Sequence, residues 1–270
     1  MATVRRPPRR WPLVVAGVLV VLIWLASGLA RFWLDLLWFR EVGKTQVFWG
    51  VLGVEIGLGL LIGLGTALIV GGNLWVAQRI AVPSRPLVVE ESGAEHLRRA
   101  LLPHLRVFRI AVVAALGLLV GLHGASQWRT YMLWRNQLPF GDRDAQFGRD
   151  IGFYVFSLPL QRAVFGWLLF TLLATTLLVV AEHWLLGGIQ PAAKGNRVAP
   201  HVHAHLAILL GCIVLLKAWS YRLDQLSLVF SPRGVVTGAS YTDVHAQLPA
   251  LRLLMLVAPV CAVLFFLNLR

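Results

Sequence analysis

Six long apolar segments limit what this chain can fold into more than any other feature of its sequence. A bilayer core about 30 Å thick is crossed by about 20 apolar residues in a helix. In lipid, backbone N–H and C=O groups must be hydrogen-bonded within the protein, so each crossing segment is a helix. The sequence therefore predicts an all-α, polytopic transmembrane helical bundle of about six spans. The predicted spans are residues 11–30, 47–70, 110–128, 163–186, 205–221 and 249–269.

The composition agrees with a membrane protein. Hydrophobic residues make up 58% of the 270 residues and charged residues only 14%, whereas about a quarter of a soluble domain is charged. The formal net charge of +13 would suggest nucleic acid in a soluble protein, but basic loops of a membrane protein contact anionic headgroups. Because no nucleic-acid-reading motif is present, we expect a lipid bilayer and no nucleic acid as partner.

The orientation follows from the basic N-terminus. Residues 1–10 contain Arg5, Arg6, Arg9 and Arg10 directly before the first span, and basic residues next to the first span stay in the cytoplasm. The sequence therefore predicts a multi-pass protein of the bacterial plasma (inner) membrane with a cytoplasmic N-terminus. Loops 129–161 and 221–248 then lie outside.

Two connecting segments are predicted to form surface helices. Residues 31–50 crowd aromatic and charged side chains between the first two spans, which is typical of an amphipathic helix lying at the membrane surface. Residues 90–109 mix charges with leucines near helical spacing. Within the spans, three glycine pairs four residues apart favour close helix packing or homo-oligomerisation. These pairs are Gly53/Gly57, Gly59/Gly63 and Gly117/Gly121.

Glu55 is the one acidic residue of the second predicted span. A charged side chain in hydrocarbon is costly, so such a residue is expected to be protonated, paired or next to water. Lys217, near the outer end of the fifth span, is a geometrically possible partner. Two interpretations stay open: a proton or cation site of a transporter, and a structural ion pair or hydrated carboxylate.

Histidines form the one pattern typical of metal sites. His201, His203 and His205 precede the fifth span, and His183 lies near the inner end of the fourth. In a helix His201 and His205 share a face, whereas an extended segment would align all three. Imidazoles can bind zinc, but the alternative is that these residues simply flank two spans at the interface. No metal ligand is therefore assigned.

Other chemistry finds little support in the sequence. The close spacing of Asp142, Asp144 and Asp150 suggests a calcium site, but the glycine and terminal acid of the EF-hand pattern are out of place. No nucleophile elbow, P-loop, dinucleotide fingerprint or metalloprotease motif is present. We therefore expect no catalytic residue, no cofactor and no enzyme activity. Cys212 and Cys261 both lie within predicted spans, where no disulfide is expected.

Three strings of sequence are similar to a known family. FWLDLLWFREVGKTQVFW (32–49), FGRDIGFYVFSLPLQR (147–162) and GASYTDVHAQLPALRLL (238–254) resemble the bacterial membrane proteins of uncharacterised protein family 0182. The resemblance implies about seven spans followed by a large extracytoplasmic region. This chain would then be an N-terminal piece, a truncated reading frame or a shortened relative. The family has no established activity that the resemblance could transfer.

The best-supported role is that of the membrane-anchoring and interaction part of a bacterial cell envelope protein. In this interpretation, loops 129–161 and 221–248 form an outer platform for envelope protein partners. Two alternatives remain. One is a transporter or channel component that uses Glu55. The other is a membrane metalloenzyme that uses His183, His201, His203 and His205.

Overall fold

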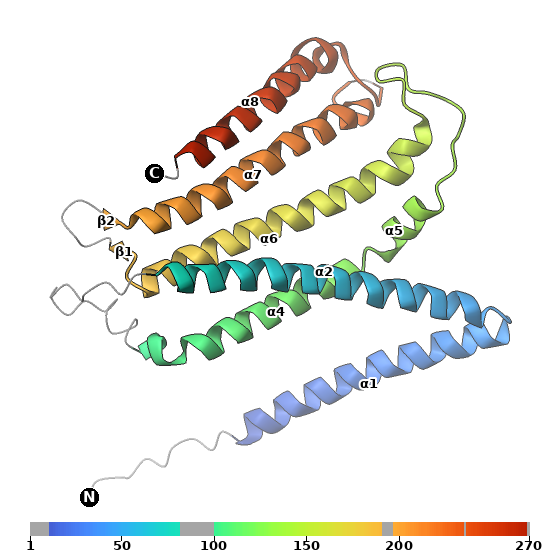
Figure 1. Cartoon of the computed structure of the whole chain (residues 1–270). Helices are drawn as coiled ribbons and strands as arrows, with labels where there is room; N and C mark the ends of the chain where they lie inside the picture. Colours follow the sequence, from blue (N-terminus) through green and yellow to red (C-terminus); the bar gives the residue numbers. More distant parts are fainter. Residues whose placement is uncertain (1–10, 82–99, 191–196, 235, 269–270) are drawn as a thin grey trace, which may run out of the picture. The chain divides into compact units, whose positions relative to one another are not determined.

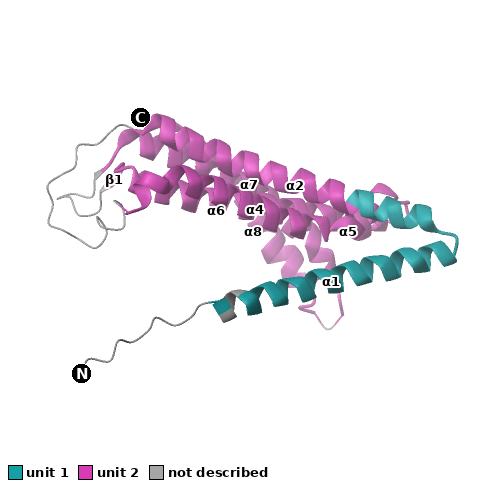
Figure 2. Ribbon diagram, turned by 90° about the horizontal axis from the view of Figure 1, so that it is seen from below, with its two compact units in different colours: residues 1–54 teal, residues 55–270 magenta. Residues whose placement is uncertain are grey.

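The computed structural model describes residues 11–81, 100–190, 197–234 and 236–268. Within them, six helices are long and apolar enough to cross a membrane, which confirms the all-α, six-span prediction. Residues 1–10, and residues 90–99 of the second predicted surface helix, lie outside the described residues. The chain divides into two compact units, Met1–Val54 and Glu55–Arg270 (Figure 2).

The first unit shows that the predicted surface helix over 31–50 is wrong. Helix α1 runs without interruption over Trp11–Glu41, and helix α2 covers Thr45–Ile80. The turn between them contains Gly43, whose φ of 70° suits glycine. The chain from Arg31 to Val42 contains neither glycine nor proline, so nothing interrupts the helical hydrogen bonds before this turn. The aromatic residues therefore belong to the ends of two long helices, where the Phe32 and Phe48 rings lie 5.3 Å apart.

The second unit contains the rest of α2 and all later elements. Helices α6, α7 and α8 run side by side (Figure 1), and α7 packs on both of the others. Residues 105–109, predicted as part of a surface helix, are the first turns of α4. The helices are α4 (Leu105–Ala125), α5 (Trp128–Arg135), α6 (Leu158–Leu185), α7 (Pro200–Ser227) and α8 (Leu248–Leu267). Strands β1 (Ile189–Gln190) and β2 (Arg197–Val198) pair antiparallel between α6 and α7.

Short helical turns adjoin these helices. The 3₁₀ turns are η1 (Leu102–His104) and η3 (Leu228–Phe230), and the π-helical turns are η2 (Phe153–Ser157) and η4 (Asp243–Gln247). Both π turns directly precede a Leu-Pro pair. A proline ring clashes with the carbonyl four residues earlier in an α-helix, and the wider π turn relieves this clash. The N–H groups of Leu158 and Leu248 accordingly bond to carbonyls five residues back.

Helices α2 and α4 approach each other backbone to backbone. A Cβ added at Gly63 would lie 2.7 Å from the carbonyl oxygen of Gly117, and one added at Gly121 would lie 2.7 Å from that of Gly59. Small residues allow such contact where no hydrophobic effect drives helices together in lipid. Two of the three predicted glycine pairs thus form this crossing. The described structure has nothing within 4 Å of a Cβ at Gly57.

One face of α6 is buried along its length. Thr171, Thr175, Val179 and His183, spaced four residues apart, are each fully buried, as expected for one helix face. Val179 packs with Val70 and Leu74 of α2 and Leu209 of α7. On this face of α6, the apolar Val179 therefore lies between two buried threonines on one side and His183 on the other.

The crossing of α2 and α4 predicts an asymmetry between two glycines of α2. Gly63→Val is expected to destabilise the bundle by about 1–3 kcal/mol, because the added atoms overlap the Gly117 carbonyl and the helices must move apart. Gly57→Val, in the same helix, is the matched control and should cost much less. Denaturation in detergent micelles measures both. Equal losses for the two variants would contradict this packing.

Candidate functional site

Carboxylates organise the loop between α5 and η2. The Asp144 carboxylate accepts hydrogen bonds from the backbone N–H groups of Gln146, Phe147 and Arg149 and from the Tyr154 hydroxyl, at 2.6–2.9 Å. A second carboxylate, Asp150, accepts three further backbone N–H groups. These belong to Phe140, Gly141 and Gly152. The loop is therefore held by charge-assisted bonds to its own backbone.

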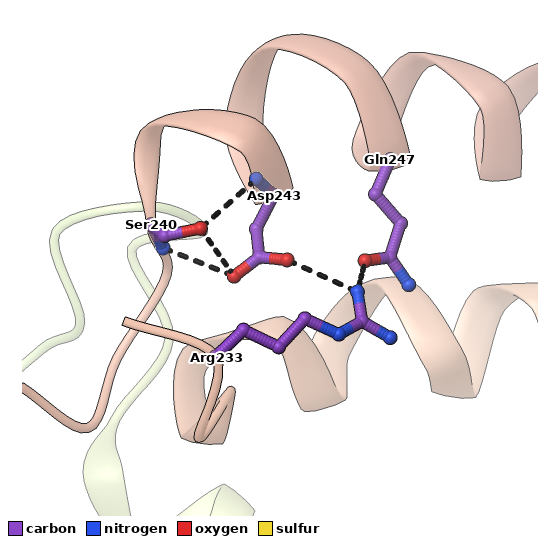
Figure 3. A network of polar contacts seen from close by, with 4 residues as sticks. All are labelled: Arg233, Ser240, Asp243 and Gln247. Carbon is purple, nitrogen blue, oxygen red and sulfur yellow. Dashed lines mark hydrogen bonds and ion pairs between the residues drawn. The ribbon is translucent and has the colours of Figure 1, made fainter. Parts of the chain in front are cut away.

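A third carboxylate organises the segment between α7 and α8 (Figure 3). Asp243 is fully buried, and its Oδ2 accepts bonds from the N–H and hydroxyl of Ser240 at 3.1 and 2.9 Å. Its Oδ1 lies 3.2 Å from the guanidinium of the exposed Arg233, which also donates to Gln247. The same carboxylate therefore fixes both the start of α8 and the loop before it.

The two loops are packed together as well as internally bonded. Phe147 contacts one core cluster containing Tyr154 and another containing Leu228 and Leu248. The Tyr154 ring also lies 5.4 Å from that of Phe230. We call residues 129–161 and 221–248 the platform, and the end of the bundle where they lie the platform end. Large apolar side chains remain exposed on it: Leu138, Phe140, Val236 and Tyr241.

The calcium interpretation finds no support in this geometry. The oxygens of Asp144 and Asp150 point to backbone N–H groups of their own loop, as described above. Burial acts to raise the pKa of Asp144, but hydrogen bonds, first that from Tyr154, lower it below its ordinary value. The N–H of Phe140, with those of Gly141 and Gly152 and the charge of Arg143, lowers the pKa of Asp150. Both groups therefore serve as structural anions.

At the opposite end, two of the predicted histidines meet. His183 Nε2 of α6 lies 3.2 Å from His205 Nδ1 of α7, and His205 Nε2 lies 3.1 Å from Asn73 Oδ1 of α2. His183 is fully buried and His205 is 5% exposed. We call this the histidine end of the bundle. The polar row joins three helices through side chains alone.

A buried ion pair lies at the same end. Arg109 of α4 forms a salt bridge with Glu182 of α6, with side chains 14% and 5% exposed. The guanidinium also donates to Gln78 of α2 at 2.6 Å. We call Gln78, Arg109 and Glu182 the arginine clasp. Together with the histidine row, it connects α2, α4, α6 and α7 by polar contacts.

The four candidate metal ligands are not all brought together. Because α7 begins at Pro200, His201 and His205 share a face, and the His201 ring lies 6.0 Å from that of His183. His203 is exposed on another face, so the extended alternative is wrong. Among the described residues, no three His, Cys, Asp or Glu side chains are grouped closely enough to hold a metal ion.

Glu55 and Lys217 are not joined as an ion pair among the described residues. The Lys217 ammonium lies 5.8 Å from the Phe165 ring and 5.1 Å from the Tyr221 ring, a cation–π arrangement. Glu55 is half-buried and lines a groove of about 530 Å³ between α2 and α4, whose other walls are apolar side chains and glycine backbone. A role of Glu55 in transport stays a prediction.

Because α2 is longer than the predicted span, Glu55 does not have to lie deep in the membrane, as the sequence suggested. The helix continues to Ile80, so Glu55 and Arg79 are separated by about 36 Å of helix at about 1.5 Å per residue. This distance exceeds the roughly 30 Å hydrocarbon core. Both charges can therefore reach the two membrane surfaces. Arg162 and Glu182 of α6 are separated by about 30 Å on the same reckoning.

Several contributing residues gave no signal in the sequence. Asn73 and Gln78 are ordinary polar residues near the end of an apolar helix. Arg109 lies just before the third predicted span, where a charged residue is expected at the surface. Thr66 accepts a hydrogen bond from the indole of Trp167 at 2.9 Å, a contact that links residues distant in sequence. The sequence offered only a general clue: polar residues within a membrane span usually face the interior of the bundle.

The fold and these sites define a polytopic membrane protein whose polar residues are concentrated at the two ends of its bundle. The sequence profile of the uncharacterised protein family UPF0182 matches residues 12–270. The chain belongs to this family, which confirms the resemblance carried by the three strings. Two of these strings, 147–162 and 238–254, contain the π turns and the carboxylates Asp150 and Asp243.

Named relatives carry no activity in their descriptions. The chain is 44% identical to a UPF0182 protein of Frankia casuarinae over 98% of its length, 40% identical to one of Thermobifida fusca over 99% and 36% identical to one of Streptomyces coelicolor over 98%. It spans about a quarter of the length of these relatives, at 26%, 26% and 27%. No solved structure matches the chain.

The arginine clasp predicts a large loss when one partner is removed. Glu182→Gln is expected to cost about 3–5 kcal/mol of folding free energy, because Arg109 is left as an unpaired buried charge. The double variant Arg109→Met, Glu182→Met should recover much of this loss. The half-exposed pair Arg162–Asp224 is the control, where Asp224→Asn should cost about 0–1 kcal/mol. Reversible denaturation in detergent tests the set, and equal costs at both pairs would contradict it.

The platform loop is expected to loosen in acid. Since the folded pKa of Asp144 lies below its ordinary 3.8, its stabilisation is complete above that value and disappears as pH falls through the folded pKa. Protection of the Phe147 and Arg149 amides, corrected for intrinsic exchange rates, should therefore hold at about pH 5 and decline below about pH 4. Asp144→Asn should lose the protection at every pH, and Asp142→Asn should keep it.

Proposed function

We propose that this chain is the membrane-anchoring and interaction part of a bacterial cell envelope protein, with its N-terminus in the cytoplasm. The platform would then lie on the outer side of the plasma membrane and receive an extramembrane polypeptide of the same protein. The observation that carries this proposal is the construction of the platform. Its loops are held by hydrogen bonds from their own backbone N–H groups to Asp144, Asp150 and Asp243.

A chain that served only as a membrane anchor would not require ordered loops between its spans. Connections between spans satisfy their backbone groups with water wherever they leave the bilayer. Here three carboxylates take up backbone N–H groups, and the resulting surface exposes Leu138 at 71%, Phe140 at 52% and Tyr241 at 78%. Fixed apolar side chains on a preorganised surface favour binding, because less conformational entropy is lost on association. This combination supports an interaction role.

The length of the relatives supports an extramembrane segment of the same protein as the proposed partner. Most of the length of each named relative lies outside the part that this chain matches. A segment of that size attached to six spans would lie next to one end of the bundle. The platform end offers ordered loops and exposed apolar groups. With the basic N-terminus in the cytoplasm, spans that alternate in direction put the C-terminal end of α2, which belongs to the histidine end, on the cytoplasmic side.

Photo-crosslinking in cells that make the native protein tests this proposal. A photoreactive residue at Leu138 or Tyr241 is expected to give crosslinked peptides from an extramembrane segment of the same protein. Leu177, 72% exposed on the flank of α6, is the matched control and should give no such peptide. An equal yield at Leu177, or none at either platform position, would reject the interaction role.

Labelling of single cysteines tests the orientation separately. After Cys212 and Cys261 are replaced by alanine, a cysteine at Tyr241 should react with a membrane-impermeant maleimide in intact cells. One at His203, exposed near the histidine end, should react only after the cells are opened. The reverse pattern would place the platform in the cytoplasm and overturn the proposed orientation.

A further inference from the structure

The groove between α2 and α4 has the size of a ligand site and an apolar lining. Its volume is about 530 Å³, which lies in the range of small-molecule pockets. Glycine backbone lines it where the two helices touch, at Gly59, Gly63, Gly117 and Gly121. Large apolar side chains, each more than half exposed, form its rims: Ile56, Leu60, Leu64, Leu118 and Leu122. Such a groove takes up hydrocarbon and excludes water.

The groove is about as long as one leaflet of a membrane is thick. Along α2 it extends from Glu55 to Ala67, and along α4 from Ala125 to Val113. Each stretch measures about 18 Å at about 1.5 Å per residue, whereas half of the hydrocarbon core is about 15 Å thick. A partner helix crossing the bilayer would need a contact face about twice as long. The length therefore fits one acyl chain of one leaflet.

Glu55 lies at the end of the groove that is nearest the platform. Ala125, which lines the same end, is the last residue of α4 before α5 and the platform loop. Within the described part of the chain, the half-buried Glu55 forms no hydrogen bond or ion pair. As shown by the length of α2, its carboxylate can reach the membrane surface. The one charge of the groove therefore lies at headgroup level, and the apolar remainder lies at the level of the acyl chains.

The chemistry of this charge limits what can bind beside it. An ionised carboxylate only accepts hydrogen bonds, so its partner must be a donor, and a cationic donor gives the strongest bond. A divalent metal ion needs several oxygen ligands, and the described residues offer no second acid in the groove. A protonated amine needs only one carboxylate. A phospholipid with an amine headgroup carries this cation directly above its acyl chains.

We propose that the groove binds one amine-bearing phospholipid, with an acyl chain between the leucine rims and the headgroup ammonium on Glu55. The acyl chain contributes little selectivity, because the surrounding lipid tails are equally apolar. The headgroup contact therefore determines which lipid is bound. A partly exposed ion pair of this kind favours the amine lipid over one without an amine by about two- to fivefold.

Lipid retention by the full chain tests the proposal. Nanodiscs containing equal amounts of phosphatidylethanolamine and phosphatidylglycerol are dissolved in mild detergent, and native mass spectrometry counts the lipids that stay bound. Phosphatidylethanolamine should be retained in about two- to fivefold excess. Glu55→Gln keeps the shape of the side chain and should retain both lipids equally. Asp142→Asn, which changes an exposed carboxylate of the platform, should keep the excess.

Two results of this experiment would overturn the proposal. One is equal retention, or no retention, of the two lipids by the unmodified chain. The other is an unchanged excess of phosphatidylethanolamine in Glu55→Gln, which would place the amine elsewhere on the protein.

Filling the groove provides an independent test. Ala114 and Ala115 are neighbouring exposed residues of α4, but only Ala114 lines the groove. Ala114→Phe should therefore lose the retained phosphatidylethanolamine, and Ala115→Phe should keep it. Equal retention by the two variants would contradict binding between α2 and α4.

Photo-crosslinking in native membranes distinguishes a lipid from a polypeptide in the groove. A photoreactive residue at Leu60, 58% exposed on the rim, should add the mass of a phospholipid to the chain. A crosslinked peptide from α1, from a second copy or from another protein would show that a helix fills the groove and would overturn the proposal.

Discussion

The absence of water in the bilayer core is the constraint on which the rest of this structure depends. Hydrocarbon offers neither hydrogen bonds to polar groups nor a hydrophobic driving force between helices. The bundle responds in two ways. Where α2 crosses α4, glycines let the backbones touch. Where α2, α4, α6 and α7 meet at the histidine end, polar side chains find partners on neighbouring helices, and these partners make the arrangement specific.

The two ends of the bundle use polar groups differently. At the platform end, carboxylates bind backbone N–H groups of nearby residues, so each loop is ordered largely by itself. At the histidine end, the bonds join side chains from different helices, so they form only when the bundle is assembled. The first arrangement orders a surface without contacts between distant helices. The second makes the polar contacts depend on how the helices pack.

The sequence predicted the class of fold well, because apolar runs of about 20 residues have one structural solution in lipid. It failed at residues 31–50, where aromatic and charged composition suggested a separate surface helix although no residue broke the helix before Gly43. The sequence identified His183 and His205 only as candidate metal ligands. Their contact with Asn73 depends on how α2, α6 and α7 pack, and local spacing contains no information about that packing.

The two π-helical turns before α6 and α8 have a consequence for how such proteins can diverge. A π turn holds one residue more than the α turn it replaces. Removing that residue would rotate everything ahead of it by about 100° around the helix axis, since an α-helix has about 3.6 residues per turn. The length of each π turn therefore sets the direction in which the preceding loop leaves the helix. A single-codon insertion or deletion at either turn would redirect a loop at the platform end while the long helix that follows kept its register.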